Sequence, residues 1–217
     1  MAADGLNLPV KCLNCHSALT TPIVCDGCHS LYPPPPWADY FSLLGLPRAY
    51  AIDKKQLNYC FRAIARGVHP DRFVGAPEEV RSLATRLSAE LNQAFDVLSD
   101  PVRRADYLLE IAGGPSAAEM REVPGDFLAD VMMLREEIDQ AKTAGDDDAL
   151  RLHRESISAR RQETLRQITA LAELSDDPDE RRHRMLRKLL NSMKYYDNLL
   201  TELAIDPLAV SARTAND

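Results

Sequence analysis

Apolar residues recur at every third or fourth position through most of the chain after Trp37, which is the spacing of one face of an α-helix. Between residues 53 and 68 this face consists of Leu57, Phe61, Ile64 and Val68. Aspartate, proline and glycine stand where such stretches begin or end. The patterns predict four helices before residue 113, over 38–45, 53–68, 77–98 and from Pro101 onward.

Three longer helices are predicted after a segment rich in glycine and proline. Residues 113–125 hold three glycines and two prolines and favour a linker. The pattern that follows predicts helices over 126–143, 146–174 and 178–204, separated by short breaks. Because short breaks make successive helices antiparallel neighbours, the sequence predicts an all-α fold that ends in a three-helix bundle.

Composition separates the chain into five parts. The first part holds four of the five cysteines and ends in the run Pro33–Pro36, which favours an extended spacer. The last part, after the final predicted helix, consists mostly of small and polar residues. The predicted parts are 1–36 (cysteine module and spacer), 37–112 (first helical domain), 113–125 (linker), 126–204 (three-helix bundle) and 205–217 (tail).

Bulk charge and hydropathy exclude several classes of protein. The chain has 217 residues, 45% of them hydrophobic, and a net charge of −7, which argues against a nucleic-acid binder because such proteins present a basic surface. No apolar run reaches the length of a membrane span, and the N-terminus lacks the pattern of a signal peptide. We therefore expect a cytoplasmic protein without a membrane partner. The alternative is the mitochondrial matrix, if a presequence has been removed.

The N-terminal part contains the unit Cys-x-x-Cys-His-Ser twice. Its cysteines, Cys12, Cys15, Cys25 and Cys28, have the spacing C-x₂-C-x₉-C-x₂-C, which suits a tetrahedral structural zinc site. A metal would also supply folding energy to a segment with little core of its own.

The same unit raises three alternatives to zinc. Cys-x-x-Cys-His is also the attachment motif of c-type haem, but two haems within nineteen residues would have little protein around them and no export signal precedes them. A thioredoxin-like redox role would need a βαβ setting, which the pattern lacks. An iron–sulfur cluster takes the same four cysteines and stays open. We predict Zn²⁺, no haem, and His16 and His29 outside the ligand set.

The sequence His69-Pro70-Asp71 lies between the second and third predicted helices. Proline keeps the residue before it out of the helical region, so His69 and Asp71 are expected on an exposed corner. Lys55, Arg62 and Arg66 form one basic stripe on the preceding helix. An ordinary loop histidine with a solvated helix face, or a catalytic His–Asp pair, would give the same pattern. The rigid corner beside the stripe favours a docking surface for an acidic partner.

Some apolar residues of the last bundle helices lie off the faces predicted to be buried. In helix 126–143 the buried face is predicted to be Phe127, Val131, Leu134, Ile138 and Ala141. Leu128 and Met132 lie roughly 100–140° from it, at ~100° per residue. In the last helix Tyr195 and Leu199 lie nearly opposite the predicted inward stripe of Leu186, Leu190, Met193, Leu200 and Ala204. They form either a patch for a partner or packing against the linker or first domain, and Leu199 is assigned to packing.

Several ordered segments resemble a J-domain. They are Tyr40-Phe41-x-x-Leu44-Gly45-Leu46, then His69-Pro70-Asp71, then Asn92-x-Ala94-Phe95-x-x-Leu98. The segments that follow are similar to the iron–sulfur co-chaperone family HscB, over about residues 38–204. They are Asp100-Pro101, Arg103-Arg104-Ala105-x-Tyr107-Leu108-Leu109, Phe127-Leu128 and Leu134-Arg135-Glu136-Glu137.

This resemblance implies the fold and the function. The fold is a J-domain helical hairpin and a C-terminal three-helix bundle, preceded by a small zinc-ribbon-like module as in eukaryotic-type members. Such co-chaperones are not enzymes: they stimulate the ATPase of a DnaK-type (HscA-like) chaperone and bring it an IscU-like scaffold protein for iron–sulfur protein maturation.

The resemblance also assigns roles to residues. His69, Pro70 and Asp71 would activate the chaperone; Lys55, Arg62 and Arg66 would dock on it; Leu128, Met132 and Tyr195 would bind the scaffold. Two other functions stay open, a general J-protein that recruits a DnaK-type chaperone to unfolded clients and an electron-transfer protein built on the cysteines.

Overall fold

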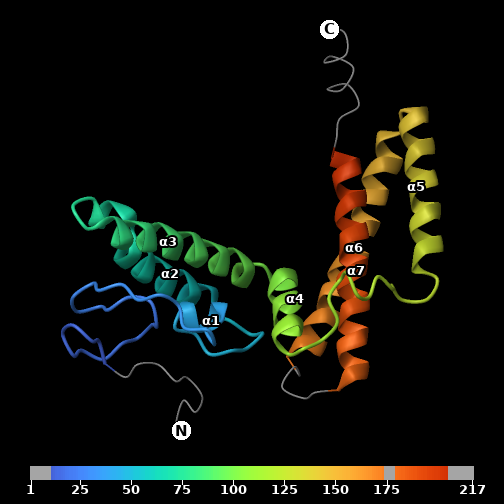
Figure 1. Ribbon diagram of the computed structural model, residues 1–217. Helices are drawn as coiled ribbons and strands as arrows, with labels where there is room; N and C mark the ends of the chain where they lie inside the picture. The colour runs from blue at the N-terminus through green and yellow to red at the C-terminus, as the bar shows by residue number, and fades with distance from the viewer. Residues whose placement is uncertain (1–10, 174–178, 205–217) are drawn as a thin grey trace, which may run out of the picture. The chain divides into compact units, whose positions relative to one another are not determined.

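The computed structural model describes residues 11–173 and 179–204, and this part of the chain is mostly helical (Figure 1). The predicted all-α fold is confirmed, and within the described residues β-structure is limited to the isolated bridges Lys11–Ala18 and Val24–Leu31. The chain divides into two compact units between Arg104 and Ala105. The helices are α1 (Tyr40–Leu43), α2 (Lys54–Val68), the 3₁₀ helix η1 (Pro70–Phe73), α3 (Glu78–Ser99), α4 (Pro101–Ile111), α5 (Phe127–Ala144), α6 (Asp147–Ala172) and α7 (Glu180–Ala204). The predicted ends at Leu174 and Pro178 lie outside the described residues.

In the first unit, α2 and α3 lie side by side as a helical hairpin (Figure 1). The carboxylate of Asp53 accepts a hydrogen bond from the N–H of Lys55 at 2.8 Å and thereby caps the start of α2. The rings of Phe61 and Phe95 stack with centroids 4.2 Å apart between the two helices. Leu57, Ile64 and Val68 are buried, so α2 buries most of the face that the pattern predicts, and Leu87 and Leu91 of α3 are buried as well.

The cysteine module belongs to the same unit and consists of two similar turns joined by residues 18–24. Each turn is closed by a backbone hydrogen bond from the N–H of its first cysteine, from Cys12 to Ser17 O at 2.7 Å and from Cys25 to Ser30 O at 3.1 Å. Ile23 and Val24, between the turns, are almost fully buried. A zinc-ribbon-like module therefore precedes the helical hairpin, as predicted.

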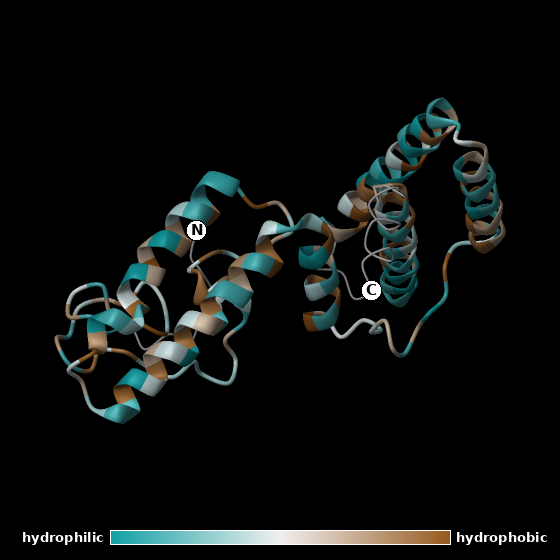
Figure 2. Cartoon of the chain, turned by 90° about the horizontal axis from the view of Figure 1, so that it is seen from above, coloured by the Kyte–Doolittle hydropathy of each residue, from teal (hydrophilic) through white to brown (hydrophobic). Residues whose placement is uncertain are grey.

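The second unit contains the predicted three-helix bundle. Gly145 ends α5 in a left-handed conformation (φ 67°), and the carboxylate of Asp146 caps α6 by accepting the N–H of Ala149 at 2.9 Å. Figure 2 shows hydrophobic and hydrophilic residues alternating in bands along the long helices. The bundle core consists of Val131, Leu134, Ile138, Ile157, Tyr196, Leu199 and Leu203.

The buried face of α7 is wider than the pattern predicts. Leu186, Leu190 and Met193 are buried as predicted, but Ala204 is exposed and Leu200 is only half-buried. Leu199, predicted near the opposite side, is fully buried in the bundle core together with Leu203. The reason is that α7 is covered on more than one side, which a single helical stripe does not represent.

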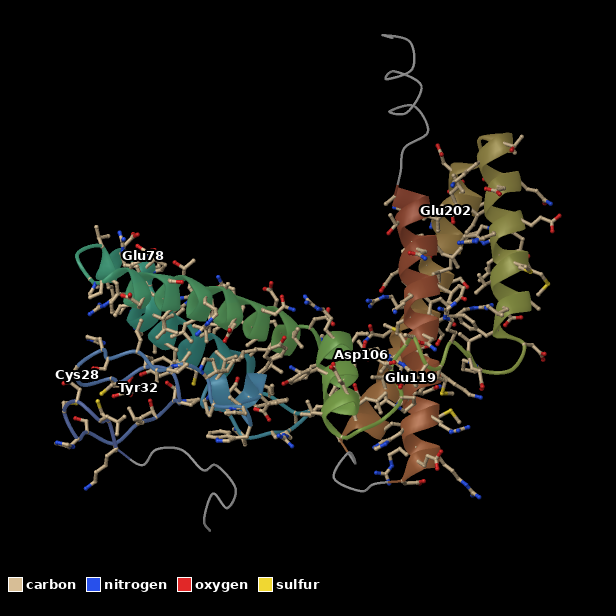
Figure 3. The ribbon with its side chains drawn as sticks, in the orientation of Figure 1. Cys28, Tyr32, Glu78, Asp106, Glu119 and Glu202 are labelled. Atoms are coloured by element: carbon tan, nitrogen blue, oxygen red, sulfur yellow. The ribbon has the colours of Figure 1, made fainter. Side chains whose placement is uncertain are left out.

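Residues 113–125, predicted as a linker, are held against α7. The side-chain amide of Asn191 donates hydrogen bonds to the carbonyl oxygens of Met120 and Glu122, both at 2.9 Å. Arg187, also buried, pairs at 2.8 Å with Asp106 of α4, which is labelled in Figure 3. Polar anchors on α7 therefore hold both α4 and the segment that follows it.

Candidate functional site

The His69 corner is built by the end of α2. His69 has extended backbone angles (φ −60°, ψ 128°), as expected before a proline, and Pro70 begins η1. The Nδ1 atom of His69 accepts a hydrogen bond from the N–H of Asp71 at 3.3 Å and lies 3.5 Å from an Asp71 carboxylate oxygen. This hydrogen bond ties the imidazole ring to the backbone of the turn.

The polar groups of this corner are accessible. The side chains of His69 and Asp71 are 56% and 86% exposed. Besides Asp71 N–H, the backbone of the corner is tied by a hydrogen bond from Arg72 N to His69 O at 3.0 Å. The corner therefore presents a histidine and a carboxylate on a short, internally bonded turn.

A shallow depression of about 510 Å³, here named the corner hollow, adjoins His69. Its walls are mostly apolar in area, and three of its lining residues are arginines. It is lined by Phe61, Arg62, Ala65, Arg66, His69 and Arg72. The structure thus brings together three of the residues singled out in the sequence, Arg62, Arg66 and His69.

Lys55 lines a neighbouring depression, here named the basic hollow. It shares Arg62 and Arg66 with the corner hollow, so the two continue along one face of α2. Its lining residues are Lys54, Lys55, Asn58, Tyr59, Arg62 and Arg66. The predicted basic stripe is therefore a continuous exposed surface that leads to His69.

Tyr59 and Arg72 also belong to this surface and were not predicted from the sequence. Tyr59 is 74% exposed, which is unusual for a large aromatic residue on a helix. The sequence could have indicated Tyr59, because residues 55, 59, 62 and 66 follow the spacing of one helical face. Arg72 follows the corner directly and carries no periodic signal of its own.

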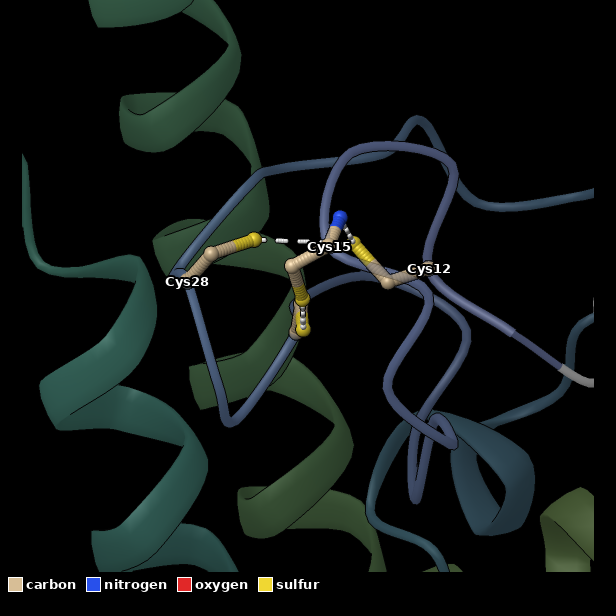
Figure 4. A group of neighbouring side chains, drawn as sticks. Cys12, Cys15 and Cys28 are labelled. Carbon is tan, nitrogen blue, oxygen red and sulfur yellow. Dashed lines mark hydrogen bonds between the residues drawn. The ribbon is translucent and has the colours of Figure 1, made fainter.

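The four cysteines of the module converge on one point (Figure 4). Their Sγ atoms all lie within 4.8 Å of one another, and the pairs Cys12–Cys28 and Cys15–Cys25 are each 3.5 Å apart. A disulfide would bring two sulfurs to about 2 Å. Four thiolates around zinc, each about 2.3 Å from it, would be about 3.8 Å apart. The arrangement fits a tetrahedral metal ion.

Backbone and side-chain donors surround the sulfurs. The N–H groups of Asn14 and Cys15 donate to Cys12 Sγ at 3.4 Å, and the N–H of Gly27 donates to Cys25 Sγ at 3.3 Å. Such donors stabilise thiolates, the form that binds metal. The paired spacing in the sequence thus becomes two matching turns that supply two sulfurs each.

Because the four thiols lie close together, their pKa values differ. The Tyr32 hydroxyl, 3.0 Å from Cys12 Sγ, lowers the pKa of Cys12 to about 5; Figure 3 labels Tyr32 close to Cys28. The Cys28 N–H pulls the pKa of Cys25 downward, but burial and the thiols of Cys15 and Cys12 together raise that pKa to about 11. Four thiols at these distances ionise together only with a cation between them, which a bound metal ion provides.

The apolar residues predicted to lie off the buried faces of the bundle helices are on α5 and α7. Leu128 and Met132 are exposed, Met132 at 73%, and Tyr195 is half-buried. The Tyr195 ring packs edge-on against Phe127, with centroids 5.6 Å apart, and Phe127 directly precedes Leu128 in α5. Met133 is exposed as well and was not singled out in the sequence. An apolar surface of α5 thus continues toward the ring of Tyr195.

Two protein-family models match the chain. The DnaJ domain matches residues 39–107, and the HSCB C-terminal oligomerisation domain matches residues 123–204. Together with the His69 corner between α2 and α3 and the following helical bundle, these matches define a J-domain co-chaperone.

Relatives identify the family within this class. A "Co-chaperone protein HscB homolog" from Azoarcus sp. is 36% identical over 141 residues, which cover 64% of this chain and 77% of the relative. Another from Chromobacterium violaceum is 39% identical over 131 residues, covering 60% of this chain and 71% of the relative. The chain belongs to the HscB co-chaperone family.

Solved structures agree with this assignment. Chaperone HscB from Vibrio cholerae is 30% identical, with a TM-score of 0.66, and the match covers 77% of this chain and 96% of that one. Human co-chaperone protein HscB is 24% identical, with a TM-score of 0.72 and a match over 89% of this chain and 96% of that one. The second match shows a shared fold.

None of the helices within residues 11–173 and 179–204 combines the length and the apolar character needed to cross a bilayer.

Proposed function

We propose that this chain is a co-chaperone of iron–sulfur cluster assembly that stimulates the ATPase of a DnaK-type (HscA-like) chaperone and presents to it an IscU-like scaffold protein. The observation that carries the proposal is the exposed His69 corner at the end of a continuous basic face of α2. The chain itself hydrolyses nothing. Its effect is a coupling free energy that favours the chaperone conformation competent for hydrolysis.

The roles along α2 follow from charge and exposure. Lys55, Arg62 and Arg66 attract and orient an acidic surface of the chaperone through long-range electrostatics. His69 and Asp71 then make the short-range contacts, because their backbone is already ordered by Pro70 and the hydrogen bond to Nδ1. Pre-ordering lowers the entropic cost of docking.

The scaffold would bind the second unit. Leu128 and Met132 expose apolar side chains, and Tyr195 adds a half-buried aromatic ring held by Phe127. Large apolar and aromatic side chains of this kind are enriched at the centres of protein interfaces. The resemblance to HscB co-chaperones supports an IscU-like scaffold as this partner.

We propose that the four cysteines hold a structural Zn²⁺. The convergent sulfurs and the short, two-turn module support a closed tetrahedral site. Purified protein should be colourless and contain about one zinc per chain by elemental analysis. A visible absorption spectrum with iron in the sample would instead indicate a cluster at these sulfurs, and a Soret band would indicate haem.

The proposed co-chaperone activity is tested by the steady-state ATPase rate of the partner chaperone, with this protein and the scaffold added singly and together. Both together should stimulate more than either alone. His69→Gln should abolish stimulation and leave scaffold binding intact. His153→Gln, a matched change in the second unit, should behave like the unaltered protein.

Unchanged stimulation by His69→Gln would contradict the J-domain mechanism. Stimulation by unfolded polypeptide in place of the scaffold would instead favour a general J-protein.

A further inference from the structure

The cysteine module contacts the helix that carries His69. Val24, which directly precedes Cys25, is almost fully buried. Its methyl groups lie so close to Gly67 of α2 that a Cβ atom placed on Gly67 would be 3.2 Å from Val24 Cγ2 and 3.5 Å from Cγ1. The module therefore rests on the last turn of α2 through this side chain.

This contact explains a glycine in an unfavourable position. Gly67 lies inside α2, where glycine is a poor helix former, and its backbone angles make no special demand for glycine. The close approach of Val24 supplies the reason, because any larger side chain at position 67 would have to displace it. A second close approach, between Thr20 O and Gly45 at the end of α1, anchors the same connecting segment.

Gly67 lies two residues before His69. Val68 between them is fully buried, and the backbone continues directly into the hydrogen-bonded corner. Whatever holds the last turn of α2 therefore also holds the base of the corner. The module and the corner share a single short structural connection.

The position of Val24 depends in turn on the cysteines. Val24 forms the bridge with Leu31, and its neighbours Ile23 and Cys25 bond to Tyr32 and Ser30 on the other side of the second turn. A module this small has little core to hold these turns once the four thiolates lose their common cation.

From this packing we infer that the cysteine module is a metal-dependent clamp on the chaperone-activating corner: metal binding seats Val24 on Gly67 and thereby orders the last turn of α2 and the His69 corner. The inference rests on the proposal that the four cysteines bind a metal ion. By linkage, docking on α2 strengthens metal binding by the same factor as metal binding strengthens docking.

The first test is hydrogen–deuterium exchange across residues 64–72, measured on the full chain with zinc bound and after removal by a chelator. Zinc content is measured on the same samples. We expect exchange in this segment to rise about tenfold on removal, within the range of typical coupling between sites. Exchange in α6 should stay constant. Loss of zinc with unchanged exchange in 64–72 would overturn the clamp but not the metal site.

The second test uses size changes at the contact. Val24→Ala keeps all four cysteines and should weaken zinc affinity at least fivefold, by competition with a chromophoric chelator. Leu13→Ala, an exposed apolar residue of the first turn, is the matched control and should change it less than twofold. Equal effects of the two changes would contradict the clamp.

Gly67→Ala distinguishes loss of the contact between Val24 and Gly67 from a loss of stability within the cysteine module. Alone, its methyl group crowds Val24 and should weaken zinc affinity. Combined with Val24→Ala it fills the space that the smaller side chain leaves, so the double variant should bind zinc more tightly than the sum of the single effects predicts. Strict additivity would mean that the two residues do not interact. If the protein is purified without metal, hydrogen–deuterium exchange of residues 64–72 still tests the contact, by comparing Val24→Ala with the unaltered protein.

Discussion

His16 and His29 hold a backbone conformation that L-amino acids adopt reluctantly, with φ angles of 60° and 57°. Each directly follows the second cysteine of its turn, and each N–H bonds back to the carbonyl of the first cysteine at 2.9 Å. These histidines therefore have a conformational role as the left-handed residue of a knuckle. Histidine is among the residues enriched in this region, which accounts for the motif that otherwise suggests haem.

This role gives a prediction at position 29. His29→Gly should bind zinc as tightly as the unaltered protein, because glycine adopts the left-handed conformation without strain. His29→Val should weaken binding several-fold, because a β-branched residue is a rare outlier in the left-handed region, whereas histidine is enriched there. The measurement is competition with a chromophoric chelator. Loss of zinc in His29→Gly would show that the imidazole itself is a ligand.

Asn191 is the residue whose amide holds the 113–125 segment on α7. Asn191→Ala removes two hydrogen bonds from buried or half-buried carbonyl groups and should lower the free energy of unfolding by about 2–3 kcal/mol. Urea denaturation followed by circular dichroism measures the change. Asn58→Ala, which removes an exposed bond within α2, is the matched control and should cost less than about 0.5 kcal/mol. Equal losses in the two variants would mean that the segment is not anchored through Asn191.

Single residues differ in how well the sequence predicts them. Spacing within a short segment is local information, so the cysteine pairs and the His69 corner could be predicted from the sequence alone. Tyr59 could also have been found, because it follows the spacing of the basic stripe. The contact of Val24 with Gly67 could not, since it joins segments more than forty positions apart, and a glycine inside a predicted helix does not indicate which residue packs against it.

Among the elements, α2 is the one whose exposed face carries the proposed docking charge. Replacing Lys55, Arg62 and Arg66 by glutamine should slow association with the chaperone about tenfold or more at low salt, because steered association depends on long-range attraction. At 0.5 M salt the difference should nearly vanish, since the charges are screened. Stopped-flow association at both salt concentrations measures this.

The control for this prediction is Arg86→Gln. Arg86 is an exposed arginine of α3 that pairs only loosely with Glu90, at 3.9 Å. Its replacement should leave the association rate nearly unchanged at both salt concentrations. A triple variant that binds more slowly by the same factor in low and high salt would have lost a short-range contact, and steering would not be its function.

Most helices agree with the sequence pattern to within one or two residues, because caps and breakers mark their ends. Asp53 and Asp146 cap α2 and α6 as predicted, and Gly145 separates α5 from α6. The exception is the buried face of α7. Periodicity identifies one apolar stripe, whereas Arg187, Asn191 and Ser192 are also buried because α4 and residues 113–125 pack on the same helix. Polar residues that pair when buried give no such signal in the sequence.

At the scale of the whole molecule, the two proposed activities reside in different units. His69, proposed to activate the chaperone, belongs to the first unit, and the surface of Leu128, Met132 and Tyr195, proposed to bind the scaffold, belongs to the second. Replacing Leu128 and Met132 by alanine, with Tyr195→Phe to retain the packing on Phe127, should weaken scaffold binding at least tenfold, because apolar anchors carry most interface energy. Isothermal titration calorimetry measures the affinity, and chaperone stimulation without scaffold should be unchanged. Leu152→Ala, an equally exposed residue of α6, is the control. If the scaffold binds both variants alike while the units stay folded, this patch is not its docking site and the bundle presents the scaffold through another face.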